Sequence, residues 1–371
     1  MGNFTFKGLF LAGLFMVLGC LSIQAADDGL ITRQVTVKVY EAGTLSEKIA
    51  YNKMYKITNL KIIGEINGTD LRVIREMGKL SVLDLSDAKI VKGGDFYYEA
   101  DLEYNGTHEY EYYYTSNDKI GDYAFDGCSG LTSLTLPSGV TEIGDYAFFR
   151  CSGLTSLTLP SGVTKIGGNA FYGCSGLTSL TLPSSVTWIG DSAFLGCSGL
   201  TSLTIPSGVT EIGGKAFYGC SGLTSLTLPS GVTEIGGNAF LGCSGLTSLT
   251  LPSGVTWIGD YAFQYCCDLT SIYVYTEKLP YMGRDVFDGC DAKKCTVYVP
   301  KGTYDDYWIS EFGYFENIVE FDPTGINNVI TSNDAKELSR YSLNGQRLSA
   351  PTKGLNIVKY SDGSVKKVAI Q

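Results

Sequence analysis

The sequence predicts a repeat solenoid with a parallel β-sheet along one side. Cysteine recurs every 23 positions, at Cys128, Cys151, Cys174, Cys197, Cys220, Cys243 and Cys266. Phenylalanine and isoleucine keep the same spacing across residues 119–275. A fixed period of this length indicates stacked units, because each unit buries its apolar face only against its neighbours. We therefore expect 23-residue repeats, degenerate capping units and a small C-terminal β module.

One complete copy, residues 131–153, shows how a unit folds. Leu134 and Leu136 alternate with polar residues, which indicates a half-buried strand. After a turn, the chain returns apolar side chains to the core. We expect Asp145 to cap a short helical turn and Gly153 to leave that turn in the left-handed conformation.

The segments outside the regular copies are atypical, as the capping units of a solenoid are. Residues 26–118 contain an edge strand, two degenerate repeat strands, a helical stretch from Thr69 to Met77 and a tyrosine-rich insertion. Residues 276–322 form a C-terminal capping repeat, in which the period slips to 24. Residues 323–371 are expected to form a linker and a β-rich tail with an Asn-Gly turn signal.

The first 25 residues indicate export. A mostly apolar run from Leu9 to Ile23 is too short to span a bilayer and is followed by the small residue Ala25. This pattern predicts a secretory signal peptide, residues 1–25, cut after Ala25. The segment ending at Cys20 loosely resembles a bacterial lipobox, so lipoprotein processing is the alternative. The mature chain has no transmembrane segment by this criterion, and we expect it at the cell surface or outside the cell.

Composition excludes several classes of function. The net charge is −10, so the chain repels phosphate backbones and nucleic acid is not an expected partner. The single histidine, His108, leaves the repeats without the base of a Ser-His-Asp or Cys-His system. It also gives no basis for a histidine-based metal site. We expect no enzymatic activity, no metal and no cofactor.

The repeated cysteines are expected to pack as buried, unbridged thiols. They form no Cys-x-x-Cys pair, which argues against metal binding. Their parallel Cβ vectors on stacked units suit a disulfide badly. Cys290 and Cys295 lie outside this ladder, and for them both a local disulfide and two free thiols are open.

The copy Ile-Gly-x-x-Ala-Phe-x-x-Cys-x-x-Leu-x-x-Leu-x-Leu-Pro closely resembles the BspA-like leucine-rich repeat family, also called the Treponema pallidum type. The resemblance covers about residues 119–300. It implies a bacterial surface protein with a right-handed leucine-rich-repeat solenoid and without catalytic residues. It also implies adhesion to host extracellular-matrix proteins or attachment between bacteria. The tail is similar to C-terminal sorting modules of Bacteroidetes export systems, and a small β cap is the alternative.

Two groups of residues are candidates for ligand contact. The first occupies the position before the inward isoleucine, which varies between copies: Glu142, Lys165, Trp188, Glu211, Glu234 and Trp257. Tryptophans dominate interface hot spots, so Trp188 and Trp257 lead this group, with packing against the adjacent unit as the alternative. The second group lies in the tyrosine-rich insertion: Tyr97, Tyr98, Tyr110 and Tyr112. That insertion suits either a glycan-stacking surface or a hairpin covering the solenoid edge.

These observations predict an exported surface binding protein, adhesin-like, that recognises a host extracellular-matrix protein or a protein of a neighbouring cell. A glycan-binding module is the alternative that the tyrosine-rich insertion favours. A passive structural spacer on the cell surface is the third hypothesis. The repeated serines and threonines that face outward fit either a hydroxyl-rich recognition face or a solvated sheet surface.

Overall fold

The structure is a computed structural model. It describes residues 29–104, 107–323, 337–342, 347–351, 353–360 and 365–370. The predicted signal peptide with Cys20 lies outside the described residues. So do most of the predicted linker and the Asn344-Gly345 turn of the tail.

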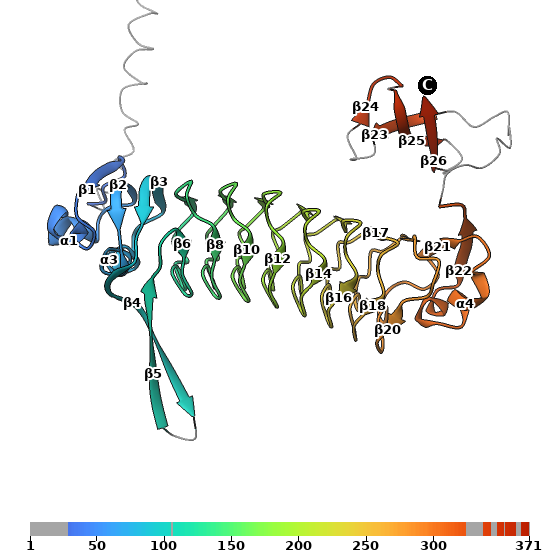
Figure 1. Cartoon of the computed structure of the whole chain (residues 1–371), viewed down its shortest axis with the longest axis horizontal. Helices are drawn as coiled ribbons and strands as arrows, with labels where there is room; N and C mark the ends of the chain where they lie inside the picture. Colours follow the sequence, from blue (N-terminus) through green and yellow to red (C-terminus); the bar gives the residue numbers. More distant parts are fainter. Residues whose placement is uncertain are drawn as a thin grey trace, which may run out of the picture.

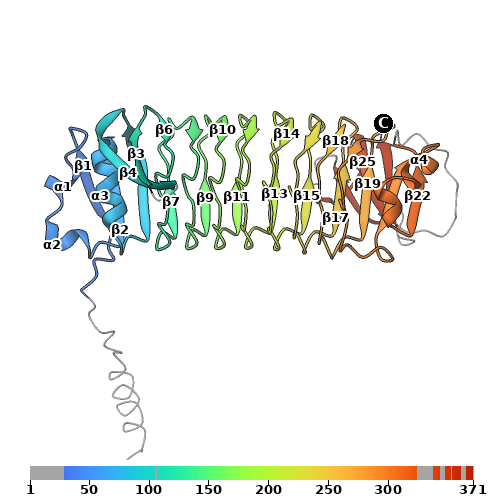
Figure 2. The ribbon, with the colours of Figure 1, turned by 90° about the horizontal axis from the view of Figure 1, so that it is seen from below.

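The chain forms an elongated solenoid whose successive turns, here called rungs, stack along one axis (Figure 1). Its larger face is a parallel sheet to which each rung contributes one strand (Figure 2). The first six strands are β1 (Val35–Val39), β2 (Asn59–Ile66), β3 (Val82–Ile90), β7 (Ser133–Thr135), β9 (Ser156–Thr158) and β11 (Ser179–Thr181). The next six are β13 (Ser202–Thr204), β15 (Ser225–Thr227), β17 (Ser248–Leu251), β19 (Ser271–Val274), β21 (Thr296–Pro300) and β22 (Asn317–Phe321). The parallel β-solenoid predicted from the repeats is confirmed.

A narrower parallel sheet, here called the small sheet, takes two residues from each rung. Its first four strands are β6 (Lys119–Ile120), β8 (Glu142–Ile143), β10 (Lys165–Ile166) and β12 (Trp188–Ile189). The other four are β14 (Glu211–Ile212), β16 (Glu234–Ile235), β18 (Trp257–Ile258) and β20 (Tyr281–Met282). In the regular copies the isoleucine of each strand is buried, and the residue before it points outward.

The turn segment that follows each small strand is not helical, so the predicted helical turn is wrong. Asp145 caps the neighbouring rung instead, since its Oδ1 accepts the N–H of Gly168 at 2.8 Å. The N–H of Phe148 likewise donates to the carbonyl oxygen of Ala170 at 2.7 Å. Hydrogen bonds along the solenoid axis therefore alternate with short-range bonds within the rung, such as the one from the N–H of Phe149 to the carbonyl oxygen of Tyr146 at 3.0 Å.

The prediction of a left-handed Gly153 is also wrong. Positive φ occurs three residues earlier, at Arg150 with φ 57° and at its equivalent Gly173 with φ 70°. Gly153 meets a steric requirement instead, because a Cβ there would overlap the carbonyl oxygen of Ser129 on the preceding rung. Close approach between rungs, rather than backbone conformation, accounts for this glycine.

The core contains a column of stacked phenylalanine rings, one from each regular rung. The ring of Phe194 lies 5.3 Å from that of Phe171 and 5.2 Å from that of Phe217. All three side chains have no exposed surface. The column continues through the 24-residue spacing, where Phe263 and Phe287 stack at 5.8 Å. Each rung therefore depends on both neighbours for its aromatic packing.

The cysteine ladder is buried beside this column, and all described cysteines are free. Buried thiols donate to the carbonyl oxygen of a phenylalanine on the preceding rung, as Cys174 does to Phe148 at 3.1 Å. The prediction of unbridged, packed thiols is confirmed for the ladder from Cys151 to Cys266. Cys290 and Cys295 are two free, buried thiols.

Helices α1 (Leu45–Lys48), α2 (Tyr51–Met54) and α3 (Gly68–Glu76) belong to the N-terminal cap. The predicted helical stretch is α3, which begins at a capping box formed by Asn67 and Asp70. Asp70 is fully buried, and its carboxylate also accepts the N–H groups of Gly43 and Leu45 at 2.6 and 2.9 Å. These bonds connect α3 to the start of α1.

The tyrosine-rich insertion is an antiparallel hairpin of β4 (Gly93–Tyr104) and β5 (Thr107–Thr115), which projects away from the solenoid (Figure 1). At the other end, α4 (Tyr304–Trp308), the 3-10 helix η1 (Glu311–Tyr314) and β22 follow β21. Phe312 and Phe315 both pack on Phe287, with ring centroids 5.1 Å apart in each pair. They close the core column.

The tail forms a separate antiparallel sheet in the order β24-β23-β25-β26. Its strands are β23 (Glu337–Ser342), β24 (Arg347–Leu348), β25 (Gly354–Tyr360) and β26 (Val365–Ile370). β23 pairs with β24 in antiparallel orientation, through Arg340 with Leu348 and Tyr341 with Arg347. The domain boundaries and the role of the tail as a sorting module stay predictions.

Both solenoid sheets are interrupted at one position within residues 119–300. β11 does not pair with β13, and β12 does not pair with β14. The N–H of Thr201 lies 3.5 Å from the carbonyl oxygen of Thr178, whereas one rung later Thr224 and Thr201 are joined at 3.1 Å. The turn-segment bonds continue across this interruption, which we call the seam. The phenylalanine column continues across it as well.

Candidate functional site

The variable residues of the repeats lie in one row on the outside of the small sheet. In-register pairing places Lys165 beside Glu142 and Trp188. It also places Glu234 beside Glu211 and Trp257. The row consists of Lys119, Glu142, Lys165, Trp188, Glu211, Glu234, Trp257 and Tyr281, and we call it the outer row. All six repeat residues predicted as candidates belong to it, and the seam passes between Trp188 and Glu211.

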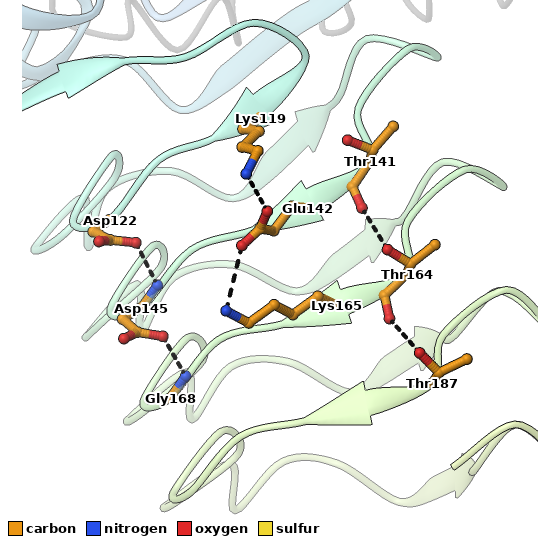
Figure 3. Close-up of polar contacts among 9 residues, drawn as sticks. All are labelled: Lys119, Asp122, Thr141, Glu142, Asp145, Thr164, Lys165, Gly168 and Thr187. Carbon is orange, nitrogen blue, oxygen red and sulfur yellow. Dashed lines mark hydrogen bonds and ion pairs between the residues drawn. The ribbon is translucent and has the colours of Figure 1, made fainter.

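The charged side chains in the first half of the outer row are paired with one another (Figure 3). Glu142 forms ion pairs with Lys119 and Lys165, the latter at 3.4 Å. The hydrogen bond from Lys119 is the main reason that the pKa of Glu142 is lowered. The ammonium of Lys165 also lies 4.7 Å from the ring centroid of Trp188, within cation–π range. These charges are therefore satisfied within the row.

The two glutamates in the second half of the outer row are not paired in this way. Glu211 and Glu234 are exposed on adjacent strands, and no ion pair among the described residues includes either of them. Trp188 and Trp257 flank the two carboxylates, with 42% and 36% of their surface exposed. The result is a strip of two indole rings with two carboxylates between them.

Tyr281 belongs to the same strip and was missed in the sequence. It pairs with Trp257 and is 66% exposed. Its position follows Trp257 by 24 residues, the same slipped spacing that relates Phe287 to Phe263. Applying the 24-residue spacing to the outer row would have identified Tyr281 as its last aromatic member.

Threonines beside the outer row connect neighbouring rungs through their hydroxyl groups (Figure 3). The hydroxyl of Thr164 donates to the carbonyl oxygen of Thr141 at 3.3 Å, and that of Thr187 donates to Thr164 at 3.4 Å. On the large sheet, Thr158 and Thr181 point outward and are exposed. The outward hydroxyls of the large sheet thus face solvent in a regular ladder.

Two of the predicted tyrosines anchor the hairpin to the solenoid. Tyr97 is 3% exposed, and its hydroxyl donates to the carbonyl oxygen of Asp122 at 2.7 Å. Burial raises the pKa of Tyr97, so its hydroxyl keeps its proton. Tyr98 stacks on Tyr123 at 4.6 Å, and burial raises its pKa to about 12. Tyr97 therefore has little surface left to offer a ligand, and packing explains its position.

The other two predicted tyrosines lie on the projecting part of the hairpin. Tyr110 and Tyr112 are 49% and 44% exposed, and they pair across the strands with Asp101 and Glu99. His108 lies nearby, with its Nδ1 2.9 Å from the carboxylate of Asp101. The structure therefore separates the four candidate tyrosines into a buried or half-buried base and an exposed arm.

Arg75 of α3 caps the turn segment of the first regular rung, where no preceding regular rung supplies backbone donors. Its Nη1 donates to the carbonyl oxygens of Tyr123 and Ala124 at 2.6 and 3.0 Å. These carbonyls belong to the first regular rung. The guanidinium also lies 4.8 Å from the ring centroid of Tyr98. No periodic signal in the sequence marks Arg75, because it lies in the irregular cap.

A cavity of about 160 Å³ lies between α3 and the first regular rung. Its lining includes Arg75, Leu83, Phe125, Cys128 and Leu131. Among the described residues, no group of three His, Cys, Asp or Glu side chains is placed to hold a metal ion. In the same part of the chain, no helix is long and apolar enough to cross a membrane.

Comparison with known proteins identifies the repeats. The model of the BspA type leucine rich repeat region matches residues 118–213 and 188–305, in six copies. A solved leucine-rich repeat protein of T. pallidum is 35% identical, with 47% of this chain and 82% of that chain covered and a TM-score of 0.43. A leucine-rich cell surface protein from Faecalibacterium prausnitzii is 24% identical, with 60% and 86% covered and a TM-score of 0.33. A search of curated proteins found none with significant similarity to this chain.

The family match extends over the rungs that carry the outer row. Together its two segments run from residue 118 to residue 305, just over half of the 371 residues. They include the phenylalanine column and the cysteine ladder described above. Leucine-rich repeats of this kind are a fold for interaction with proteins rather than for catalysis. The chain belongs to the BspA-type leucine-rich repeat family.

Proposed function

We propose that this chain is an exported, adhesin-like binding protein of the cell surface that recognises a host extracellular-matrix protein or a protein of a neighbouring cell. The observation that carries the proposal is the exposure of Trp188 and Trp257 on an otherwise polar row. Export would proceed through cleavage after Ala25 or through lipid attachment at Cys20. The chain acts by binding, without catalysis or a cofactor.

The two tryptophans can position a ligand along the solenoid. The outward serines and threonines are nearly identical in every copy, so they offer a partner the same contacts at every rung. Trp188 and Trp257 break this uniformity. They lie three rungs apart, which is roughly 15 Å at about 4.8 Å per strand. One standard protein interface covers that distance.

The test is binding of the mature chain to a panel of purified extracellular-matrix proteins and bacterial surface proteins. Replacing both residues, Trp188→Ala with Trp257→Ala, should reduce the free energy of binding to a partner by more than about 2 kcal/mol, which is the loss expected at a hot spot. The matched control is Trp308→Ala, because Trp308 is 48% exposed but lies in α4, outside the outer row. Normal binding by the double variant would contradict the proposed site.

A glycan-binding role for the hairpin is the second candidate function. Tyr110, Tyr112 and Tyr114 are exposed on the projecting β5, where sugar rings could stack on them. A polysaccharide array would distinguish the two proposals. Glycan hits lost in Tyr110→Ala/Tyr112→Ala would favour the hairpin, and protein hits lost in the tryptophan variant would favour the outer row. If neither the proteins nor the polysaccharides bind, the result would favour a passive structural spacer on the cell surface.

A further inference from the structure

We infer that the outer row between Trp188 and Trp257 binds a segment of the partner protein that carries lysine or arginine side chains. This inference rests on the proposed function and names the chemistry of the partner at that site. The occupant is a cationic protein segment that lies along the outer row.

The chain itself shows how a cation is held on this row. The ammonium of Lys165 lies 3.4 Å from the carboxylate of Glu142 and 4.7 Å from the ring centroid of Trp188. These three residues occupy three consecutive rungs. A carboxylate on one side and an indole on the other therefore hold one ammonium group on the outer surface of the small sheet.

The same three-rung arrangement recurs without its cation. Glu211, Glu234 and Trp257 occupy consecutive strands, with a glutamate where the first set has its lysine. Like charges directly opposite each other on paired strands repel and destabilise the pairing. A lysine or arginine from a partner would relieve this repulsion. It would also lie within reach of the ring of Trp257.

Neighbouring charges leave the two carboxylates available. Lys215, on the turn segment of the same rung as Glu211, is exposed and forms no ion pair with it among the described residues. Asp260, on the turn segment of the rung of Trp257, is already paired with Arg284 at 3.2 Å. The overall charge of −10 adds to the attraction of a basic segment.

The flanking rings favour an organic cation over a metal ion. A calcium ion takes six to eight oxygen ligands, and two exposed carboxylates on adjacent rungs supply too few of them. Ammonium and guanidinium groups are instead attracted to the faces of indole rings within about 6 Å. The ring of Trp257 and the two glutamates together therefore select a side chain of lysine or arginine.

The test uses the mature chain and a synthetic peptide of alternating lysine and glycine as the probe, with its fully acetylated form as the uncharged comparison. The wild-type protein should bind the lysine peptide, more weakly as salt rises, and should not bind the acetylated form. The variant Glu211→Gln/Glu234→Gln should weaken this binding by about fivefold or more, since exposed charge pairs contribute modestly but two are lost.

The matched control is Glu41→Gln/Glu47→Gln, which changes the net charge equally at two exposed residues of the N-terminal cap. It should leave the affinity for the peptide within about twofold. An equal loss in both variants would show attraction by the net charge alone and would overturn the inference. Unchanged binding in the outer-row variant would overturn it as well. Circular dichroism of each variant checks that the fold is intact.

The two proposals can fail separately. If the tryptophan variant loses a protein partner but Glu211→Gln/Glu234→Gln keeps it, the proposed function holds and the cationic partner is rejected. If the lysine peptide binds as expected but no surface protein does, the outer row recognises cations and the adhesin-like role is rejected.

Discussion

The Sγ atom of Cys174 lies 3.1 Å from the carbonyl oxygen of Phe148 on the preceding rung. The same contact recurs in the ladder at Cys151, Cys197, Cys220, Cys243 and Cys266, and beyond the ladder at Cys290. A thiol is a weak donor, yet here it donates a hydrogen bond to a carbonyl oxygen that is buried between two rungs. The cysteine is therefore both a small apolar packing group and a bridge between neighbouring rungs.

The first prediction concerns thiol reactivity. Burial raises the pKa of Cys174 to about 12, and the thiolate is the form that alkylating agents attack. With iodoacetamide at about pH 8, Cys267 should react first in the native protein, because among the described cysteines it is the one that is exposed. The thiols from Cys151 to Cys243 should react only after unfolding. Peptide mapping by mass spectrometry measures this, and rapid native labelling of Cys174 would contradict its burial.

The second prediction concerns pH. The folded state favours the protonated thiol of Cys174, whose pKa is raised from about 9 to about 12. This stabilisation is fully present below about pH 9 and is lost as the pH rises towards 12, by about 1.4 kcal/mol per pH unit. Replacing the thiol in Cys174→Ser should reduce the steepness of the alkaline loss by that amount. Urea unfolding at a series of pH values measures this loss, and equal steepness in Cys174→Ser and the wild type would contradict the prediction.

The third prediction concerns the aromatic column. Phe194→Ala removes a ring that stacks on Phe171 and Phe217, and should cost about 3–5 kcal/mol in the free energy of unfolding. Trp188→Ala, on the same rung but exposed, should cost less than about 1 kcal/mol. Denaturant unfolding followed by circular dichroism compares them. A loss below 1 kcal/mol for Phe194→Ala would argue against a cooperative core column.

The fourth prediction concerns the N-terminal cap. Arg75→Met removes two charge-assisted hydrogen bonds, to Tyr123 and Ala124, and should destabilise the protein by about 2 kcal/mol. Arg72, one turn earlier in α3, makes only an exposed ion pair with Asp95 at 3.1 Å and a contact with Phe96. Arg72→Met should therefore cost less than about 1 kcal/mol. Thermal unfolding measures both variants. An equal fall in Tm for the two would show that the bonds of Arg75 to the first regular rung contribute no special stability.

The fifth prediction concerns the seam. The amide of Thr201 lies 3.5 Å from its acceptor, whereas the amides of Thr178 and Thr224 lie 3.1 Å from theirs. All three occupy the same place in their rungs and are exposed or nearly so. Hydrogen exchange should therefore be faster at Thr201 than at the other two. Equal protection at all three positions would show that both sheets are continuous in solution.

The features that could be predicted are those set by the spacing of apolar residues within one copy of the repeat. The alternation around Leu134, the inward Ile143 and the buried Phe148 follow from the sequence, because apolar side chains at fixed spacing must leave water together. The row of candidate residues also follows, since parallel pairing at a constant period brings equal positions side by side.

The candidate site could be predicted only in part. Its members share a position in the repeat, and this position varies while the rest of the copy is constant. Their charge balance cannot be read from that pattern. Glu142 is neutralised by two lysines and Glu234 is not, although both are glutamates at the same place in the repeat. Which neighbour lies on the adjacent rung decides the difference.

The period, the parallel stacking and the buried faces of the rungs follow from the repeated residues alone. The course of the hydrogen bonds follows from the stacking of the rungs in three dimensions. Asp145 reaches Gly168 on the next rung, and Gly153 approaches Ser129 on the previous one, so neither residue serves the helical turn expected within its own copy. The physical reason is that hydrophobic burial depends on spacing along the chain. Backbone donors and acceptors are instead satisfied by whichever groups the fold brings nearest, some within the rung and others on the adjacent rung, as for Gly168 and Asp145.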